Sequence, residues 1–226
     1  MIPFKCYSRF MPKSVEAPAQ RGLPGRKAQA ARNDELILAA ARDVFLAEPK
    51  APISAVAERA GVGISALYRR YPSKEELLRT LCYQGLHRYN AEAEAALADS
   101  DDWRAFTGFL ERVVDADVHS LTTHLAGTFT PDESILPAVI RAGELNAELM
   151  RRARESGRLR AGVTTADLGL ILESCAAISL TDPQRAVQLR RRVLALLIDG
   201  LTGSGDLPGP PPAPDEFAHR WQPDSR

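Results

Sequence analysis

Apolar residues along this chain recur at the spacing of a helix, and no stretch shows the strict alternation of a strand. The clearest early case is the run 35–45, ELILAAARDVF, whose apolar positions at intervals of three and four fall on one helical face. That face consists of Ile37, Ala40, Ala41, Val44 and Phe45. Asn33 precedes the run as a plausible N-cap, followed by Asp34 and Glu35. We therefore predict a first helix that begins at Asn33.

Two short helices are predicted on either side of a glycine-containing turn. Residues 52–60, PISAVAERA, put Val56, Ala57 and Ala60 on one face and so favour a helix. The turn is made by residues 61–63, and the next helix runs from Ile64 to about Tyr71, where Pro72 stops it. The segment 52–71 thus has the pattern of a helix-turn-helix.

The same glycines superficially resemble a phosphate-binding loop. A dinucleotide fingerprint needs a strand before it and a third glycine, and here the third position is Ala66 while the preceding segment is helical. The sequence therefore gives no support for a nucleotide-binding loop.

Longer helices are predicted over the rest of the chain. Ser73 followed by Glu76 is a capping box that opens a fourth helix, expected to run to about Ala98. Thr165 or Asp182 would cap later helices, and a turn is expected between Gly157 and Gly162. The later helical periods lie in 102–121, 133–157, 165–180 and 182–201. The predicted fold class is all-α, with an N-terminal three-helix domain that contains the helix-turn-helix, followed by a larger helical domain.

The two ends of the chain differ from this pattern. Residues 1–32 are rich in Pro, Gly, Ala and basic groups without an apolar period, so we predict a disordered basic arm. The segment 204–226 contains GDLPGPPPAP and is predicted to be an extended proline-rich tail. Between them we expect a first helical domain at 33–81, with the helix-turn-helix at about 52–71, and a second helical domain at 82–203.

Charge is unevenly distributed, although the formal net charge is +0. Residues 1–79 carry 14 basic and 8 acidic side chains, whereas residues 80–226 carry 15 basic and 21 acidic ones. A basic front part beside an acidic back part suggests a polyanionic partner for the front part alone.

Other classes of protein find little support in the sequence. Cys6, Cys82 and Cys175 are widely separated, which indicates neither a disulfide framework nor a zinc ribbon. His119 and His124 are five positions apart and point in different directions on a helix, so no metal site is expected. Neither a signal peptide nor a membrane span is evident. We therefore expect a protein of the cytoplasm, associated with the nucleoid, with no cofactor and no membrane contact.

The segment from Asn33 to about Leu81 resembles the DNA-binding domain of the tetracycline-repressor (TetR-type) family of bacterial transcription regulators. The resemblance lies in AERAGV (57–62), in Leu67 and Tyr68, and in YPSKEEL (71–77) at the family's spacing. It departs from the family at Gly63, where many relatives have a serine or threonine cap, and at Ile64, where relatives often carry a polar residue. Compared with a serine or threonine, glycine at an N-cap lowers helix stability by only about a few tenths of a kcal/mol, so the motif should still fold.

The resemblance and the exposed side of the third helix together suggest which residues meet DNA. Ser65 and Ala66 are expected to contact base edges in the major groove, whereas Tyr68, Tyr71 and Lys74 resemble the phosphate-contacting set of the family. For Arg69 and Arg70 three alternatives stay open: contact with guanine edges, contact with phosphates, or a solvated surface without DNA contact. The full predicted set is Ile64, Ser65, Ala66, Tyr68, Arg69, Arg70, Tyr71 and Lys74, with Arg26, Lys27 and Arg32 of the arm reaching the minor groove or its phosphates.

The family resemblance also implies an effector ligand held inside the second domain and a homodimer formed through its last two long helices. The candidates for the ligand site are mostly polar or aromatic side chains on the predicted helices. Each of them could instead belong to the hydrophobic core. These candidates are Trp103, Phe106, Phe109, His119, His124, Phe129, Glu144 and Met150. Glu173, in an apolar helix, is equally compatible with an interface, a pocket or the surface.

The sequence contains no motif of a catalytic nucleophile or phosphate loop beyond residue 82, so no enzymatic activity is expected. The predicted function is a ligand-responsive, sequence-specific regulator of transcription, in all expectation a repressor, whose partners are double-stranded operator DNA, an unidentified small molecule and a second copy of the chain. The alternative is a helical small-molecule-binding or enzymatic domain with an incidental basic arm. Retardation of promoter DNA by the purified protein would separate the two.

Overall fold

The computed structural model describes residues 24–125, 128–129, 132–213 and 216, and within them every regular element is a helix. These elements are α1 (Pro24–Ala47), α2 (Ile53–Ala60), α3 (Ile64–Arg70), α4 (Lys74–Leu97), α5 (Asp102–Asp115), α6 (Val118–Leu125), the 3₁₀ turn η1 (Glu133–Ile135), α7 (Leu136–Glu155), α8 (Asp167–Ala176) and α9 (Pro183–Gly200). The all-α fold class predicted from the sequence is confirmed. None of the described helices is both long and apolar enough to cross a membrane.

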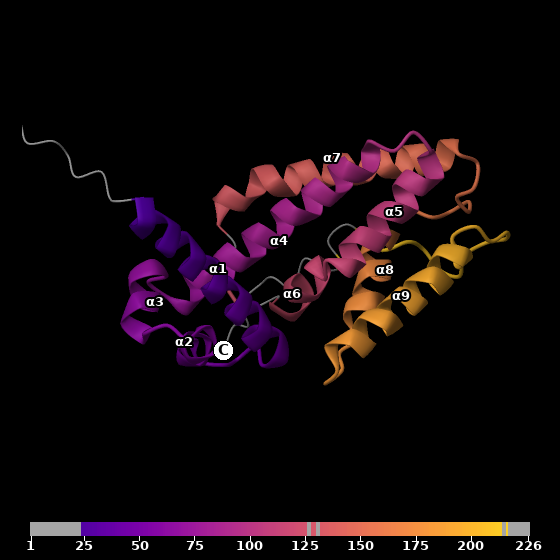
Figure 1. Cartoon of the computed structure of the whole chain (residues 1–226). Helices are drawn as coiled ribbons and strands as arrows, with labels where there is room; N and C mark the ends of the chain where they lie inside the picture. The colour runs from indigo at the N-terminus through magenta and orange to yellow at the C-terminus, as the bar shows by residue number, and fades with distance from the viewer. Residues whose placement is uncertain (1–23, 126–127, 130–131, 214–215, 217–226) are drawn as a thin grey trace, which may run out of the picture.

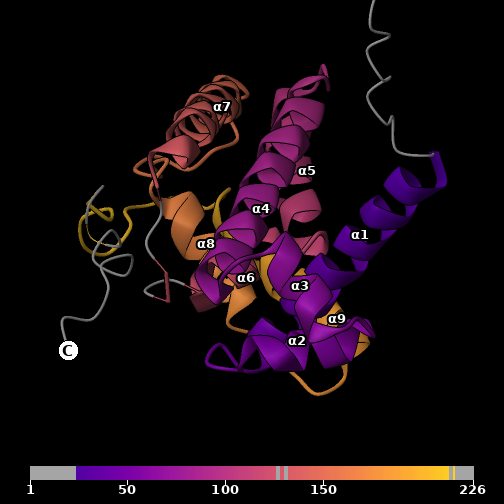
Figure 2. The ribbon, with the colours of Figure 1, turned by 90° about the vertical axis from the view of Figure 1, so that its left-hand side faces the viewer.

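The helices form two groups joined by α4. At one end α1, α2 and α3 cluster together, and α4 leaves this cluster with α7 packed along it (Figure 1). Helix α5 contacts both α4–α7 and the pair α8–α9, which lie side by side (Figure 1). Viewed from the end that carries α1–α3, α7 and α1 lie on opposite sides of α4 (Figure 2).

Two hydrophobic cores correspond to these groups, but their boundary does not follow the chain. The first core unites α1–α3 and the start of α4, and it includes Leu121 and Leu125 of α6 together with Phe129. The second core is built by the end of α4 with α5, α7, α8 and α9. Helix α6, which lies far beyond residue 81 in the sequence, therefore packs into the core of the N-terminal domain.

The first helix begins earlier than the sequence predicted. We placed its start at Asn33, whereas α1 starts at Pro24, so the part of the predicted disordered arm after residue 23 is helical. Proline suits the first turn of a helix because its missing N–H has no partner there anyway, and alanine has the highest helix propensity. Gln29 reinforces the turn by accepting from Arg32 and donating to Asn33, both at 2.9 Å. Residues 1–23 lie outside the described part of the chain.

Several predicted caps are present. The Ser73 hydroxyl accepts from the Glu76 N–H at 3.0 Å, which confirms Ser73 as the N-cap of α4, while the Glu76 carboxylate pairs with Arg79. Asp182 caps α9 through the N–H groups of Gln184 and Arg185. Thr165 does not cap a helix, because α8 begins at Asp167 with Ala166 as its N-cap residue.

The stretch 102–121 is two helices and not the single one that its period predicted. Helix α5 ends at Asp115, and α6 begins at Val118 after a turn in which Asp117 has a positive φ of 50°. Aspartate tolerates this left-handed conformation better than most side chains. The apolar period continues through the break, so the pattern alone did not reveal it.

Candidate functional site

The turn between α2 and α3 is set by the backbone conformation of Gly61. This residue has a φ of 66° as the C-cap of α2, and its N–H is bonded to the last carbonyls of that helix. A Cβ at this position would meet nothing within 4 Å, so glycine is favoured by the positive φ and not by lack of space. Leu67, fully buried, then anchors α3 against the core.

Four residues of α3 point away from the protein and form what we call the α3 face: Ile64, Ser65, Tyr68 and Arg69. Ile64 and Tyr68 are 40% and 47% exposed, which is high for such large apolar or aromatic groups. Ala66 beside them is half-buried. A convex helix face that combines a hydroxyl, an aromatic ring, a guanidinium and an aliphatic group can enter the major groove of DNA.

Arg70 belongs to a bidentate ion pair that ties α3 to α1. Its Nε lies 2.6 Å from Asp34 Oδ1, and its Nη2 lies 2.5 Å from Asp34 Oδ2. A planar guanidinium held at two points fixes orientation as well as distance. Arg70 therefore braces the α3 face against the first helix, whereas no such pair is recorded for Arg69 among the described residues.

The predicted contact of Tyr71 with a phosphate stays a prediction. Its side chain is buried in the first core, only 5% exposed, and burial raises the pKa of its phenol. The ring therefore packs inside the domain, and the Arg70 guanidinium lies over it, 5.9 Å from the ring centre. Tyr71 entered the predicted set by resemblance to the family, and its packing in the first core encloses most of the residue.

Lys74 has partners within the chain. Its Nζ donates to the carbonyls of Ala51 at 2.7 Å and Pro49 at 3.1 Å, and it lies 4.9 Å from the centre of the Phe45 ring. Burial lowers the pKa of this ammonium group. The Lys74 ammonium group thus donates to two carbonyl oxygens of the loop between α1 and α2. A phosphate, its predicted partner, would compete with these oxygens for it.

The three basic residues predicted to reach DNA from the arm lie on α1. Arg32 is exposed and bonded to Gln29. Arg26 and Lys27 fall within the helix, but their side chains lie outside the described part of the structure. Their contact with DNA stays a prediction.

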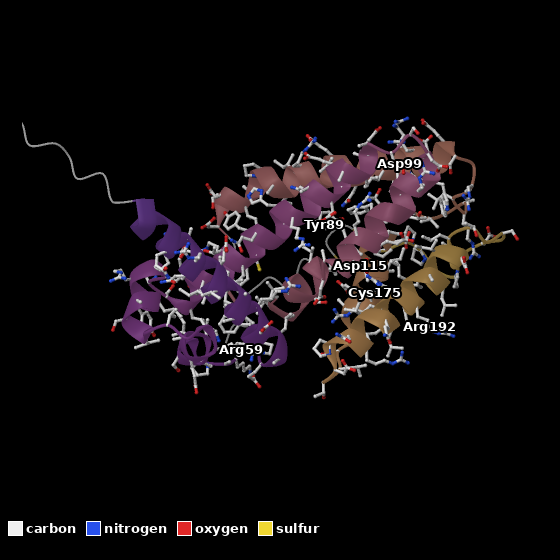
Figure 3. The ribbon with its side chains drawn as sticks, in the orientation of Figure 1. Arg59, Tyr89, Asp99, Asp115, Cys175 and Arg192 are labelled. Carbon is white, nitrogen blue, oxygen red and sulfur yellow. The ribbon has the colours of Figure 1, made fainter. Side chains whose placement is uncertain are left out.

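A cavity of about 490 Å³ lies in the regulatory part, between α4, α6, α7 and α8. Its apolar walls include Leu86, Val118, Phe129, Ile135, Leu168 and Leu172. Its polar groups are few, and two of them are bonded to each other: the Tyr89 hydroxyl donates to Asn146 Oδ1 at 2.8 Å. Tyr89 projects from α4 within the body of the molecule (Figure 3).

Only some of the predicted ligand residues line this cavity. His119 and Phe129 do so. Glu144 is exposed and paired with Arg141, and the side chain of His124 lies outside the described residues. The remaining candidates, Trp103, Phe106, Phe109 and Met150, are buried in the second core instead of lining the cavity. The aromatic period of α5 marks packing because that helix is covered on several sides.

Tyr89 and Asn146 were missed by the sequence analysis. They are separated by 57 positions and come from different helices, so nothing local relates them. Each lies in an amphipathic helix where a polar residue is expected on the surface. Only the packing of α4 against α7 brings them together beside the cavity.

The described residues contain no evident catalytic or metal chemistry. Cys82 lines the cavity, but burial raises the pKa of its thiol to about 12, so it stays protonated and unreactive. Cys175, labelled on α8 in Figure 3, is also buried, and burial raises its pKa. No group of three or more potential metal ligands occurs within the described part of the chain.

Asp117 connects the two halves of the molecule, in an arrangement that we call the Asp117 junction. Its carboxylate lies 2.7 Å from Arg190 Nη1 of α9 and 3.3 Å from Arg42 Nη2 of α1, and Arg42 also donates to its carbonyl. Arg190 is only 9% exposed, and its Nε donates to the carbonyl of Ile178 at 2.9 Å. The next two residues, Val118 and His119, line the cavity. One turn therefore contacts the N-terminal domain, α9 and the cavity wall.

Helices α8 and α9 keep apolar side chains on their outer side. Leu196 of α9 is 63% exposed and Leu170 of α8 is 40% exposed. Leu197 and Ile198, also on α9, are partly buried and pack against the chain's own second core. Arg192 projects outward from α9 (Figure 3), and Glu173 is half-buried on α8. Leu196 and Leu170 are therefore large apolar side chains that the described part of the chain leaves uncovered.

Two family models match the chain. The one described as bacterial regulatory proteins, tetR family, matches residues 37–81, and the one described as transcriptional regulator SbtR-like, C-terminal domain, matches residues 101–203. Together they cover the α1–α3 cluster and most of the regulatory part. No curated protein sequence matches the chain.

Solved structures share the fold over nearly their full length. The TetR transcriptional regulator SCO0520 from Streptomyces coelicolor is 25% identical, with a TM-score of 0.54, over 74% of this chain and 97% of that one. The TetR transcription regulatory protein from Mycobacterium vanbaalenii is 27% identical, with a TM-score of 0.54, over 79% and 99%. The TetR-like regulator LfrR from Mycobacterium smegmatis, solved in complex with proflavine, is 23% identical, with a TM-score of 0.53, over 73% and 95%.

Proposed function

The chain belongs to the TetR family of DNA-binding transcriptional regulators, and from this premise we propose that it is a homodimeric repressor which a small molecule releases from its operator. The observation that carries the proposal is the exposed α3 face, which the Arg70–Asp34 pair holds against α1. The regulatory part of the same chain contains a cavity of the size that small-molecule ligands occupy. As a regulator of chromosomal genes it would act in the cytoplasm, at the nucleoid.

The proposed mechanism depends on the distance between two recognition helices. In a dimer, two α3 faces must lie about 34–36 Å apart to enter successive major grooves on one side of the duplex. A ligand that prefers a differently spaced state shifts the dimer away from DNA by its differential affinity for the two states. The Asp117 junction is suited to transmit such a shift, because the same turn holds Arg42 of α1 and continues into the cavity wall.

Retardation of DNA from the chain's own promoter region tests this function. We expect the purified full chain to bind this DNA with a Kd that rises steeply with salt, because Lys and Arg side chains displace counterions from phosphates. An unrelated duplex should bind far more weakly. If both duplexes bind equally, or neither does, a ligand-binding or enzymatic helical protein with an incidental basic end becomes the better reading.

Arg69 tests the α3 face. We expect Arg69→Ala to reduce DNA affinity, and if the guanidinium contacts a phosphate the loss should be uniform over sequences, with the salt slope smaller by about one. If it contacts a guanine, selection on randomised DNA should instead return a motif relaxed at one base pair.

A matched control removes the same charge far from α3. Arg104 is paired with Asp99, which lies at the far end of the molecule (Figure 3). Arg104→Ala should leave affinity, slope and preferred sequence unchanged. Equal behaviour of the two variants would remove Arg69 from the interface.

A further inference from the structure

Resting on the proposed regulator function, we propose that the effector is an uncharged, largely apolar molecule with one hydrogen-bond acceptor, which the Asn146 side-chain amide in the cavity recognises. The site is the cavity of about 490 Å³, a size typical of small-molecule sites. The inference rests on what lines this cavity, on the Tyr89–Asn146 pair, and on the space beside Gly169.

The cavity offers no permanent charge to a ligand, and His119 is the ionisable imidazole of its described lining. Among the described residues that line it there is no Asp, Glu, Lys or Arg. An ion moved from water into apolar surroundings without a counter-charge loses several kcal/mol, roughly. Because the described lining holds no carboxylate, it selects against ammonium or acridinium cations, and because it holds no ammonium or guanidinium group, it gives carboxylates and phosphates no permanent counter-charge.

The hydrogen bond between Tyr89 and Asn146 fixes the orientation of the Asn146 amide beside the cavity. Because the Asn146 oxygen accepts from the Tyr89 hydroxyl at 2.8 Å, the amide group turns its two N–H donors elsewhere. Among the described residues no acceptor is recorded for those donors. A carbonyl or ether oxygen of a ligand would satisfy one of them. Tyr89 is itself held from behind by the Phe109 ring, edge to face at 5.2 Å between centroids, so the pair is preorganised.

Tyr89 orients the Asn146 amide and adds no charge beside it. Burial raises the pKa of its phenol to about 12, so the hydroxyl stays a neutral donor at any physiological pH. Its hydrogen bond therefore keeps the Asn146 oxygen occupied and its nitrogen available. In Tyr89→Phe the amide is free to rotate, and the preference for an acceptor is expected to weaken.

Gly169 of α8 provides a way to close the site without disturbing it. It lines the cavity, and an added Cβ there meets nothing within 4 Å. Leucine at this position would occupy the cavity and would also favour the helix over glycine. Gly143 of α7 offers a matched control, since it is exposed and its added Cβ likewise meets nothing.

The experiment compares probes of similar shape and different charge on the full-length protein. The probes are methyl 2-naphthoate, which is neutral with a carbonyl acceptor, naphthalene, which has no acceptor, 2-naphthoate, which is an anion at pH 7, and proflavine, a cation. Binding is measured by calorimetry or fluorescence at concentrations up to the solubility of each probe. We expect the ester to bind at least tenfold more tightly than naphthalene and at least 100-fold more tightly than either ion.

The variants test the assigned residues. Asn146→Leu should lose tenfold or more in affinity for the ester while affinity for naphthalene changes less than threefold. Gly169→Leu should abolish binding of both neutral probes and keep a thermal midpoint at or above the wild-type value, whereas Gly143→Leu should bind as the wild type does. Equal loss of both probes in Asn146→Leu would remove the amide from the site.

Other outcomes overturn the proposal in distinguishable ways. Tight binding of 2-naphthoate or proflavine, or no binding of any neutral probe, would show that the effector class is wrong even if the chain retards its promoter DNA. Binding of the ester with the expected variant pattern, but without DNA retardation, would leave the cavity assignment standing and remove the regulator function. The two proposals therefore fail independently.

Discussion

Leu196→Asp is expected to yield a folded monomer that no longer binds operator DNA with useful affinity. Leu196 is the most exposed large apolar side chain of α9, and in a two-fold symmetric dimer its replacement places a carboxylate in the contact from both subunits. An unpaired buried charge costs several kcal/mol, so the dimer should weaken by roughly 100-fold or more. A monomer engages one half-site only. Sedimentation velocity, a circular-dichroism melt and DNA retardation measure the three consequences.

Leu197→Asp is the matched control at the neighbouring position. Leu197 packs against the second core of its own chain, so its replacement should lower the free energy of unfolding by about 3 kcal/mol or more and leave little folded protein of any size. The pair separates an interface from a core by a shift of one residue along α9.

A dimeric Leu196→Asp protein with wild-type DNA binding would show that the subunits meet elsewhere. The clearest alternative surface is on α7, where Leu136, Val139 and Ile140 are all about half exposed or more. Ile140→Asp would then be the variant that dissociates. The outcome decides between two apolar surfaces that the single chain leaves uncovered.

Asp117→Asn is expected to lower the free energy of unfolding by about 3 kcal/mol, since it leaves the buried Arg190 guanidinium without its counter-charge. Asparagine tolerates the positive φ at this turn, so the change tests the charge and not the backbone. Urea melts monitored by circular dichroism provide the measurement. The variant should also weaken ligand-induced release from DNA, because the contact between α1 and the turn before the cavity wall loses its ion pair and keeps only the bond from Arg42 to the carbonyl of residue 117.

Asp115→Asn serves as the control for this prediction. Asp115 is two positions earlier and pairs with Arg191 at 2.5 Å, but both side chains are largely in solvent, where such pairs contribute at most about 1 kcal/mol. A second variant, Arg190→Met, should recover part of the stability lost in Asp117→Asn, since it removes the unpaired charge. Equal destabilisation by Asp115→Asn and Asp117→Asn would argue against the junction as a buried ionic link.

The helix-turn-helix could be predicted from the sequence because its determinants are local. Gly61 supplies a positive φ, and Ser73 caps α4 through a residue three positions away. Apolar positions at helical spacing then orient α2 and α3 on their common core. The exposed positions of α3 follow from the same period, which is why Ser65 and Arg69 were predicted to be outside.

The start of α1 and the break at Asp117 could not be predicted, although both are local in sequence. Residues 24–32 have no apolar face, and without one a stretch rich in proline, glycine and basic groups has the composition of a disordered arm. The helix extends there as the continuation of a packed segment. At Asp117 the turn is stabilised by two arginines from distant helices.

The sequence by itself determined the helical elements, the exposed α3 face and the family, since each depends on residues within a few positions of one another. Only the tertiary structure decided which polar side chains have hydrogen-bond or ionic partners within the chain and which can still bind another molecule. Lys74 contacts Ala51 across 23 positions, Tyr89 contacts Asn146 across 57, and Arg42 contacts Asp117 across 75. Helical periodicity tells which side of a helix is buried but not which helix covers it, so these partners, and the cavity between them, exist only once α1, α4, α6 and α7 have packed.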